Sequence, residues 1–135
     1  MNKKIKSIVL IDDDLAINYF HKRLFLKLEL GDNVLPFYNS TDALEGILKL
    51  DQTHSAEDLV YIFLDLNMPD IDGWAFIKKF EKINESLKFE VKIFILSSSI
   101  NTEDVEKAKN NNFVTNYFVK PLMIEGIIAI KEMYS

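Results

Sequence analysis

Residues 59–65 read Leu-Val-Tyr-Ile-Phe-Leu-Asp, six apolar side chains that end at a carboxylate, and residues 66–73 continue as Leu-Asn-Met-Pro-Asp-Ile-Asp-Gly. A short run that is apolar at every position is typical of a strand buried on both faces, as in the centre of a parallel sheet. The Pro, Asp and Gly residues after it predict a loop. Asp65 is therefore expected at the carboxyl end of a central strand, where open α/β sheets bind their ligands.

Four further apolar segments accompany this strand along the chain. The predicted strands cover residues 5–11, 33–38, 59–64, 91–96 and 114–119. Four of the five are followed by a stretch whose apolar residues recur every three or four positions, which is the spacing of an amphipathic helix. After the fourth strand, residues 101–104 predict a helix start and the asparagines at 110–112 predict its end. Five strands alternating with five helices predict a doubly wound α/β sheet with helices on both faces.

The predicted helices have recognisable start signals. Asp14 is expected to cap the first helix, Ser40 or Thr41 the second, and Asp72 the third. Pro121 is expected in the first turn of the last helix, where its missing N–H costs nothing. The buried face of the first helix is predicted to contain Ile17, Phe20, Leu24 and Leu28.

The composition narrows the function classes. The 135 residues are 48% hydrophobic and 12% aromatic, enough for one globular domain with a core. A net charge of -5 argues against nucleic acid as the main partner, because phosphate binding needs a basic surface.

The absence of cysteine excludes disulfides and thiolate catalysis. The two histidines, His21 and His54, are expected at the surface. No segment resembles a membrane span or a signal peptide, which favours a cytoplasmic protein.

Polar side chains follow four of the predicted strands at the positions where those strands end. Asp12 and Asp13 follow the first strand, Asp65 the third, Ser97 the fourth and Lys120 the fifth. Because the carboxyl ends of parallel strands meet at one edge, these side chains are expected in one pocket. Three carboxylates repel one another, and a hard divalent cation such as Mg²⁺ relieves that repulsion. The sequence therefore predicts a Mg²⁺ site for phosphoryl transfer in which Asp65 is the nucleophile.

Taken together, these segments make the chain resemble the receiver domains of two-component response regulators, in particular those of the chemotaxis type. The resemblance extends from about Lys4 to the C-terminus. It implies a flavodoxin-like, three-layer α/β/α fold with strand order 2-1-3-4-5, and one receiver domain over residues 1–135 without an output domain. The resemblance rests on Asp12-Asp13, on residues 64–73, on the hydroxyl of Ser97 and on residues 117–121, Tyr-Phe-Val-Lys-Pro.

The resemblance implies a role for each acid. Asp65 is the phosphoacceptor, and the donor is a histidine kinase or a histidine phosphotransfer protein. Mg²⁺ is held by the carboxylates of Asp13 and Asp65, by the backbone carbonyl of Asn67, and by Asp12 mainly through water. The expected activity is that of a signalling switch with intrinsic phosphotransfer and slow self-hydrolysis, and not that of an enzyme. The protein is expected to be a monomer or a weak dimer.

A conformational switch is also implied by the resemblance. Ser97 and Lys120 hold the phosphoryl group, the Ser97 hydroxyl moves toward it, and Tyr117 turns from exposed to buried. The surface made by the fourth helix, the fifth strand and the fifth helix then changes shape and is recognised by a downstream protein. Serine stands at position 97 where threonine is commoner in the family, so its hydroxyl is less restricted in rotation.

Other interpretations of the same residues make different predictions. A haloacid-dehalogenase-like phosphohydrolase needs an acid two residues after its aspartyl nucleophile, where this chain has Asn67 after Asp65. A receiver-like interaction module would ignore phosphate, and the complete set of acids, hydroxyl and amine argues against it. A flavin- or nucleotide-binding protein of this fold would carry a glycine-rich turn after the first strand, which is absent. Whether the phosphoryl group controls an effector or is passed on in a phosphorelay stays open.

Overall fold

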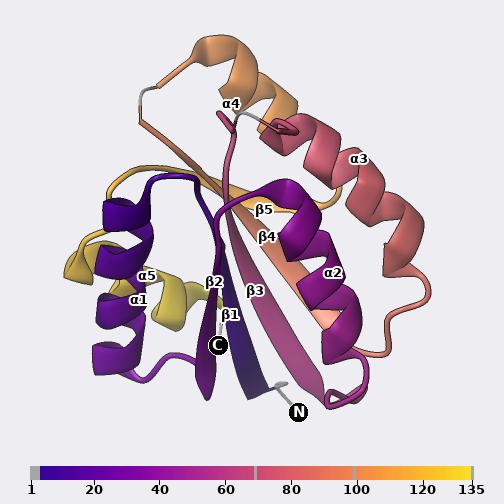
Figure 1. The fold of residues 1–135 in the computed structure, drawn as a ribbon. Coiled ribbons are helices and arrows are strands. Elements are labelled where there is room, and N and C mark those ends of the chain that lie inside the picture. Colours follow the sequence, from indigo (N-terminus) through magenta and orange to yellow (C-terminus); the bar gives the residue numbers. More distant parts are fainter. Residues whose placement is uncertain (1–3, 69, 99, 135) are drawn as a thin grey trace.

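A five-stranded parallel sheet with helices on both faces forms the molecule in the computed structural model, which describes residues 4–68, 70–98 and 100–134 (Figure 1). The strand order is β2-β1-β3-β4-β5, and every neighbouring pair is parallel. This confirms the predicted fold class and strand order. The elements are β1 (Lys4–Ile11), α1 (Leu15–Leu28), β2 (Asn33–Phe37), α2 (Ser40–Leu50), β3 (Asp58–Asp65), α3 (Gly73–Asn84), β4 (Glu90–Ser97), α4 (Thr102–Lys109), β5 (Val114–Val119) and α5 (Ile124–Tyr134).

The central strand β3 is buried on both faces, as its unbroken apolar run predicts. Val60, Ile62 and Leu64 belong to the core cluster that α2 and α3 cover. Tyr61 and Phe63 belong to the opposite cluster, which α1 and α5 cover (Figure 1). Each fully buried side chain of this size stabilises the fold by about 1.5–3 kcal/mol. The position of Asp65 at the end of β3 is therefore set by packing on both sides of the sheet.

The buried face of α1 agrees with the prediction only in part: Leu24 and Leu28 pack against a core cluster. Phe20, expected in the core with Ile17, Leu24 and Leu28, is 38% exposed. The buried residues of α1 are Asn18, His21 and Phe25. The expectation that His21 lies at the surface is therefore wrong. The Asn18 Nδ2 and the His21 Nε2 make hydrogen bonds to backbone atoms of other segments, which offsets the cost of burying these two groups.

His54 is buried as well, and its predicted surface position is also wrong. Its Nε2 lies 2.9 Å from Ser7 Oγ, and its Nδ1 lies 2.9 Å from Thr53 Oγ1. The ring packs against Phe89 with 5.4 Å between the centroids. Burial, with the charge of Lys6, lowers the pKa of His54 below its ordinary value. This network holds the loop that precedes β3, at the end of the strand opposite Asp65.

The helix caps agree with the sequence at two of three positions. Asp14 accepts the N–H groups of the first turn of α1, and Asp72 does the same for α3. The cap of α2 is Asn39, and neither Ser40 nor Thr41, which were predicted. Serine, threonine and asparagine are all good capping residues, so three of them in succession leave the exact start of a helix undetermined.

The helices of this fold are short. The longest, α1, has 14 residues. In the described part of the chain, no helix combines the length and the apolar character needed to cross a membrane.

Candidate functional site

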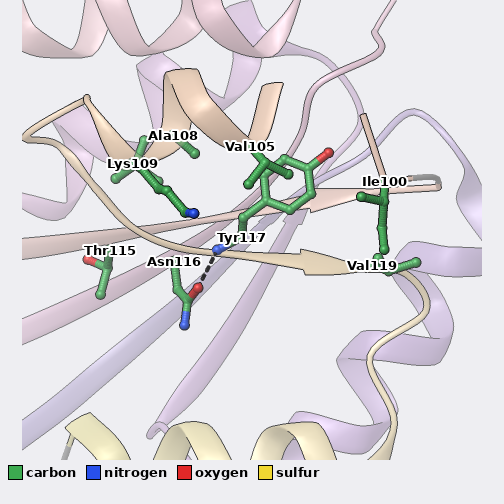
Figure 2. A pocket seen from close by; sticks show the side chains of 9 residues that line it. Ile100, Val105, Ala108, Lys109, Thr115, Asn116, Tyr117 and Val119 are labelled. Atoms are coloured by element: carbon green, nitrogen blue, oxygen red, sulfur yellow. Dashed lines mark hydrogen bonds between the residues drawn. The ribbon is translucent and has the colours of Figure 1, made fainter. Parts of the chain in front are cut away.

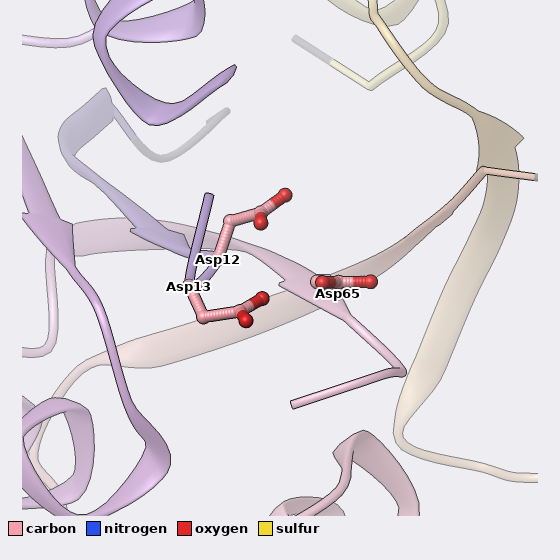
Figure 3. A group of neighbouring side chains, drawn as sticks. All are labelled: Asp12, Asp13 and Asp65. Carbon is pink, nitrogen blue, oxygen red and sulfur yellow. The ribbon is translucent and has the colours of Figure 1, made fainter. Parts of the chain in front are cut away.

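Three carboxylates meet at the carboxyl edge of the sheet (Figure 3). Asp12 and Asp13 follow β1, and Asp65 is the last residue of β3. One oxygen of each carboxylate lies within 4.8 Å of the other two. Asp12 and Asp65 are buried, whereas Asp13 is exposed. The cluster arises because β1 and β3 are paired in parallel register, so that their ends lie side by side.

Lys120 reaches the acids from the far end of the chain. Its Nζ lies 2.9 Å from Asp12 Oδ2 and 3.3 Å from Asp65 Oδ2. The amide N–H of Lys120 donates to the carbonyl of Ser97 at 2.8 Å, which attaches the end of β5 to the end of β4. The peptide bond before Pro121 is cis. Helix α5 starts beyond Pro121, so this residue does not lie in the first helical turn as predicted.

The charges of the site shift the pKa values of its members. Burial and the charge of Asp12 together raise the pKa of Asp65 to about 6, although Lys120 opposes both effects. Burial alone would lower the pKa of Lys120, but its hydrogen bond to Asp12 and the charges of Asp12 and Asp65 raise it above its ordinary value. With every group ionised, three carboxylates and one ammonium leave an excess of negative charge at this edge of the sheet.

The donor set fits a hard divalent cation. Mg²⁺ binds oxygen ligands, typically one or two carboxylates with waters and phosphate oxygens. Two of the carboxylates are buried and the third, Asp13, faces solvent, which suits an ion that keeps part of its water shell. Asn67, the predicted carbonyl ligand, lies next to these acids because its amide N–H donates to Asp65 Oδ1 at 3.2 Å.

The loop between β3 and α3 is held by contacts to two helices. The Gly73 N–H donates to the Leu66 carbonyl at 2.9 Å. A Cβ at Gly73 would lie 2.8 Å from Leu66 Cα, so this close approach requires glycine. The Asp70 carboxylate accepts the N–H of Ser40 at 3.1 Å and so connects the loop to the start of α2. Pro69, part of the predicted signature, lies outside the described residues.

Ser97 and Tyr117, the predicted switch residues, lie on neighbouring strands. Ser97 ends β4 and is buried. Tyr117 on β5 is half-buried and lines a groove of about 430 Å³ between α4 and β5. Figure 2 shows the Tyr117 ring beside Val105, with Ile100 and Val119 at one end of the groove. The roles of Ser97 and Tyr117 in switching stay predictions.

Two buried residues next to the site were missed by the sequence reasoning. The Asn18 Nδ2 donates to the carbonyl oxygens of Asp12, at 3.0 Å, and of Phe37, at 2.9 Å. The His21 Nε2 accepts the N–H of Leu122 at 2.9 Å. Asn18 and His21 lie three positions apart, and hence on one helix face. A search for apolar periodicity overlooks such a face because its inward residues are polar.

The comparisons with known proteins agree on one family. Residues 8–131 match the family described as response regulator receiver domain. A two-component response regulator from Cytophaga hutchinsonii is 26% identical, with 96% of each chain covered and a TM-score of 0.83. A response regulator receiver protein from Dyadobacter fermentans is 23% identical, with 94% of this chain and 96% of that chain covered and a TM-score of 0.80.

Below 25% identity, as for the Dyadobacter structure, the likeness shows the fold alone. A chemotaxis protein of Vibrio cholerae is 18% identical, with 97% of this chain and 99% of that chain covered and a TM-score of 0.72. No match was found among curated proteins.

Proposed function

The chain belongs to the response regulator receiver domain family, and from this we propose that it is a phosphorylation switch with Asp65 as its phosphoacceptor. A receiver domain is a signalling module and not a classical enzyme. The observation that carries the proposal is the cluster of Asp12, Asp13 and Asp65 at one sheet edge, with the Lys120 ammonium 3.3 Å from Asp65. This arrangement combines a nucleophile, a cation site and a positive charge for phosphoryl oxygens.

Asp65 supplies the nucleophile. One of its carboxylate oxygens attacks the phosphorus of a phosphohistidine or of a small acyl phosphate. A new O–P bond forms, the P–N or P–O bond of the donor breaks, and its electron pair leaves with the donor. A pKa of about 6 leaves Asp65 ionised at neutral pH and therefore able to attack.

The other polar groups stabilise the charge that develops. In this proposal the carboxylates of Asp13 and Asp65 and the carbonyl of Asn67 would hold Mg²⁺, and Asp12 would act mainly through water. When bound, Mg²⁺ would neutralise charge on the phosphoryl oxygens. The Lys120 ammonium would exchange its contact with Asp65 for a phosphoryl oxygen.

A partner protein would recognise the phosphorylated state on the surface formed by α4, β5 and α5. Ser97 would donate its hydroxyl to the phosphoryl group, and Tyr117 would follow by turning inward. Support comes from the groove in which Tyr117 lies, because Ile100 and Val119 at that groove are 76% and 44% exposed. Exposed apolar side chains around a groove suit a protein partner. The phosphoryl donor would be a histidine kinase or a histidine phosphotransfer protein.

The decisive experiment is intact mass after incubation with acetyl phosphate, with and without Mg²⁺. We expect a single phosphoryl adduct that depends on Mg²⁺ and is absent from Asp65→Asn. Circular dichroism of the variant checks that it is folded. No adduct on the folded wild-type protein would refute the proposal and favour a module that binds partners independently of phosphate. Phosphomonoester turnover beyond one phosphoryl group per protein would instead indicate a phosphohydrolase.

A further inference from the structure

The inward face of α1 carries two polar side chains, although the face that a helix turns toward a core is usually apolar. Asn18 and His21 are each 1% exposed. Burying an amide or an imidazole is unfavourable unless hydrogen bonds replace those lost to water. The Asn18 Nδ2 and the His21 Nε2 bond to backbone atoms at the carboxyl edge of the sheet. The polar face of α1 is thus directed at the strand ends that carry the acids and the lysine.

Asn18 joins the ends of the first two strands. Its amide donates to the carbonyl of Asp12 and to the carbonyl of Phe37, the last residue of β2. The Phe37 carbonyl also accepts the amide N–H of Asp12 at 3.1 Å. The backbone on both sides of Asp12 is therefore held in place, and with it the carboxylate that contacts Lys120.

His21 joins α1 to the segment after β5. The N–H of Leu122 donates to His21 Nε2 at 2.9 Å, across 101 residues of chain. Two residues earlier, the N–H of Lys120 donates to the carbonyl of Ser97. Residues 120–122 are thus held at both ends, on β4 and on α1. Leu122 is buried, so in this structure the imidazole accepts its N–H away from solvent.

The contact specifies the state of the imidazole. Nε2 accepts a hydrogen bond only when the ring is neutral and its proton lies on Nδ1. Burial lowers the pKa of His21 to about 4, with opposing contributions from Asp12, which raises it, and Lys120, which lowers it. The ring is therefore neutral at physiological pH, as the contact with Leu122 requires.

On the basis of the proposed role of Asp65, we infer that His21 is a positioning residue of the phosphoacceptor site. By accepting the Leu122 N–H, it holds residues 120–122 so that the Lys120 ammonium reaches Asp12 and Asp65. Asn18, on the same helix face, holds Asp12 from the other side. His21 touches neither the phosphoryl group nor the cation, and its effect on the chemistry passes through Lys120.

The test compares two substitutions at position 21. Glutamine keeps an acceptor that can reach the Leu122 N–H, whereas leucine has a similar volume and no acceptor. The rate of Asp65 phosphorylation by acetyl phosphate is measured by intact mass at saturating Mg²⁺ over a range of donor concentrations. We expect His21→Leu to lower the maximal rate about tenfold, as for other residues that orient a reacting group indirectly, and His21→Gln to restore most of it.

Phe25→Leu is the matched control for lost stability. Phe25 is buried on the same face of α1, and its apolar ring packs in the core cluster without a hydrogen bond to residues 120–122. Equal slowing of His21→Leu and Phe25→Leu at equal loss of stability would mean that His21 has only a structural role. A folded His21→Leu protein that reacts like wild type, or a folded His21→Gln protein that reacts like His21→Leu, would also overturn the inference.

A second readout does not depend on phosphorylation. In NMR spectra of the unphosphorylated protein, we expect the His21 ring in the Nδ1–H tautomer. The Lys120 Nζ and Cε resonances should move in His21→Leu and stay in place in Phe25→Leu. Unchanged Lys120 resonances in His21→Leu would overturn the inference, whether or not the wild-type protein accepts a phosphoryl group. Failure of the wild-type protein to accept a phosphoryl group would by itself refute only the proposed function.

Discussion

The ammonium of Lys120 lies 2.9 Å from Asp12 Oδ2, although 108 residues separate the two in the sequence. Its distance to Asp65 Oδ2 is longer, 3.3 Å. Before phosphorylation, one cation is thus shared by two buried acids and makes its shorter contact with the acid that is not the proposed nucleophile. A phosphoryl group on Asp65 would add acceptor oxygens and compete for this ammonium.

Replacing Lys120 by alanine should separate the chemistry from the switch. Lys120→Ala keeps the nucleophile and the cation ligands, so some phosphorylation should remain, at a reduced rate. The response of Tyr117 should be lost, because the ammonium no longer moves toward the phosphoryl group. Intact mass measures the first effect, and NMR of the Tyr117 ring measures the second. Lys79→Ala, which removes an exposed lysine of α3, is the control. A wild-type response of Tyr117 in Lys120→Ala would contradict the switch model.

Asp13→Ala should abolish Mg²⁺ binding and phosphorylation while leaving the fold intact. Asp13 is exposed, so its loss should change the free energy of unfolding by no more than about 0.5 kcal/mol. Calorimetric titration with MgCl₂ measures the affinity. Glu57→Ala removes the same charge just before β3, at the opposite end of that strand, and should bind Mg²⁺ like wild type. Unchanged Mg²⁺ affinity in Asp13→Ala would show that the ligands are assigned wrongly.

Asp65→Asn should stabilise the metal-free protein at neutral pH. The pKa of Asp65 is raised from 3.8 to about 6, so between these values the native state binds more protons than the unfolded state. Wild-type stability therefore decreases as pH rises through that window, by up to about 3 kcal/mol from this group. Asparagine does not titrate. Urea unfolding in EDTA should show a gain at pH 7.5 that shrinks toward pH 4.

Mg²⁺ provides an internal control for this stability difference. Saturating Mg²⁺ binds the native wild-type protein and stabilises it, whereas the variant lacks one ligand. The advantage of Asp65→Asn at pH 7.5 should therefore shrink or reverse when Mg²⁺ replaces EDTA. Equal stability of both proteins in EDTA at pH 7.5 would mean that ionised Asp65 costs the fold nothing.

His21 should make the protein sensitive to acid. Its pKa is lowered from 6.5 to about 4, so between these values the unfolded state binds more protons than the native state. The stability that neutral His21 contributes is complete above pH 6.5 and is lost as pH falls toward 4. Relative to His21→Gln, wild type should lose about 1.5 kcal/mol at pH 5.5 and nearly 3 kcal/mol near pH 4, by roughly 1.4 kcal/mol per pH unit. Urea unfolding at several pH values measures this, and a difference independent of pH would contradict it.

Trp74 should report phosphorylation by its fluorescence. It is the one tryptophan in the sequence and lies in the first turn of α3, just after the loop that begins at Asp65. Its indole Nε1 donates to Asp104 Oδ1 on α4 at 3.1 Å, and the Lys107 ammonium lies 5.0 Å from the ring centroid. A movement of α4 would change both contacts, and with them the emission.

The control for this signal is a pair of variants at position 104. Asp104→Ala removes the acceptor of the indole N–H, whereas Asp104→Asn keeps an oxygen that can accept it. Emission spectra with Mg²⁺ and acetyl phosphate should change in wild type and in Asp104→Asn, and much less in Asp104→Ala. An identical change in all three proteins would show that Trp74 does not sense α4.

The features predicted best from the sequence are those that depend on residues close together along the chain. Residues 59–64 are apolar at every position, which predicted a strand buried on both faces, and β3 has that environment. Asp14 and Asp72 were predicted as caps because a capping side chain bonds to N–H groups two or three residues ahead. The convergence of Asp12 and Asp65 followed from the rule that parallel strands end at the same edge.

The errors concern residues whose partners are distant. His21 and His54 were expected at the surface because nothing near them in sequence explains their burial. His21 bonds to Leu122, and His54 to Ser7, across 101 and 47 residues respectively. The burial of Asn18 and His21 on α1 was missed for the same reason, since the pattern of apolar residues does not show which polar residues will find backbone partners.

By itself, the sequence determined the succession of strands and helices along the chain and the chemical groups at the strand ends. It could do so because periodicity, capping and strand termination are local properties. Only the tertiary structure decided that Lys120 lies closer to Asp12 than to Asp65, and that Asn18 and His21 face inward toward the site. These relationships depend on how the strand ends, α1 and the segment after β5 pack together. Their energies come from desolvation and hydrogen bonding between segments far apart in the chain, which no local pattern encodes.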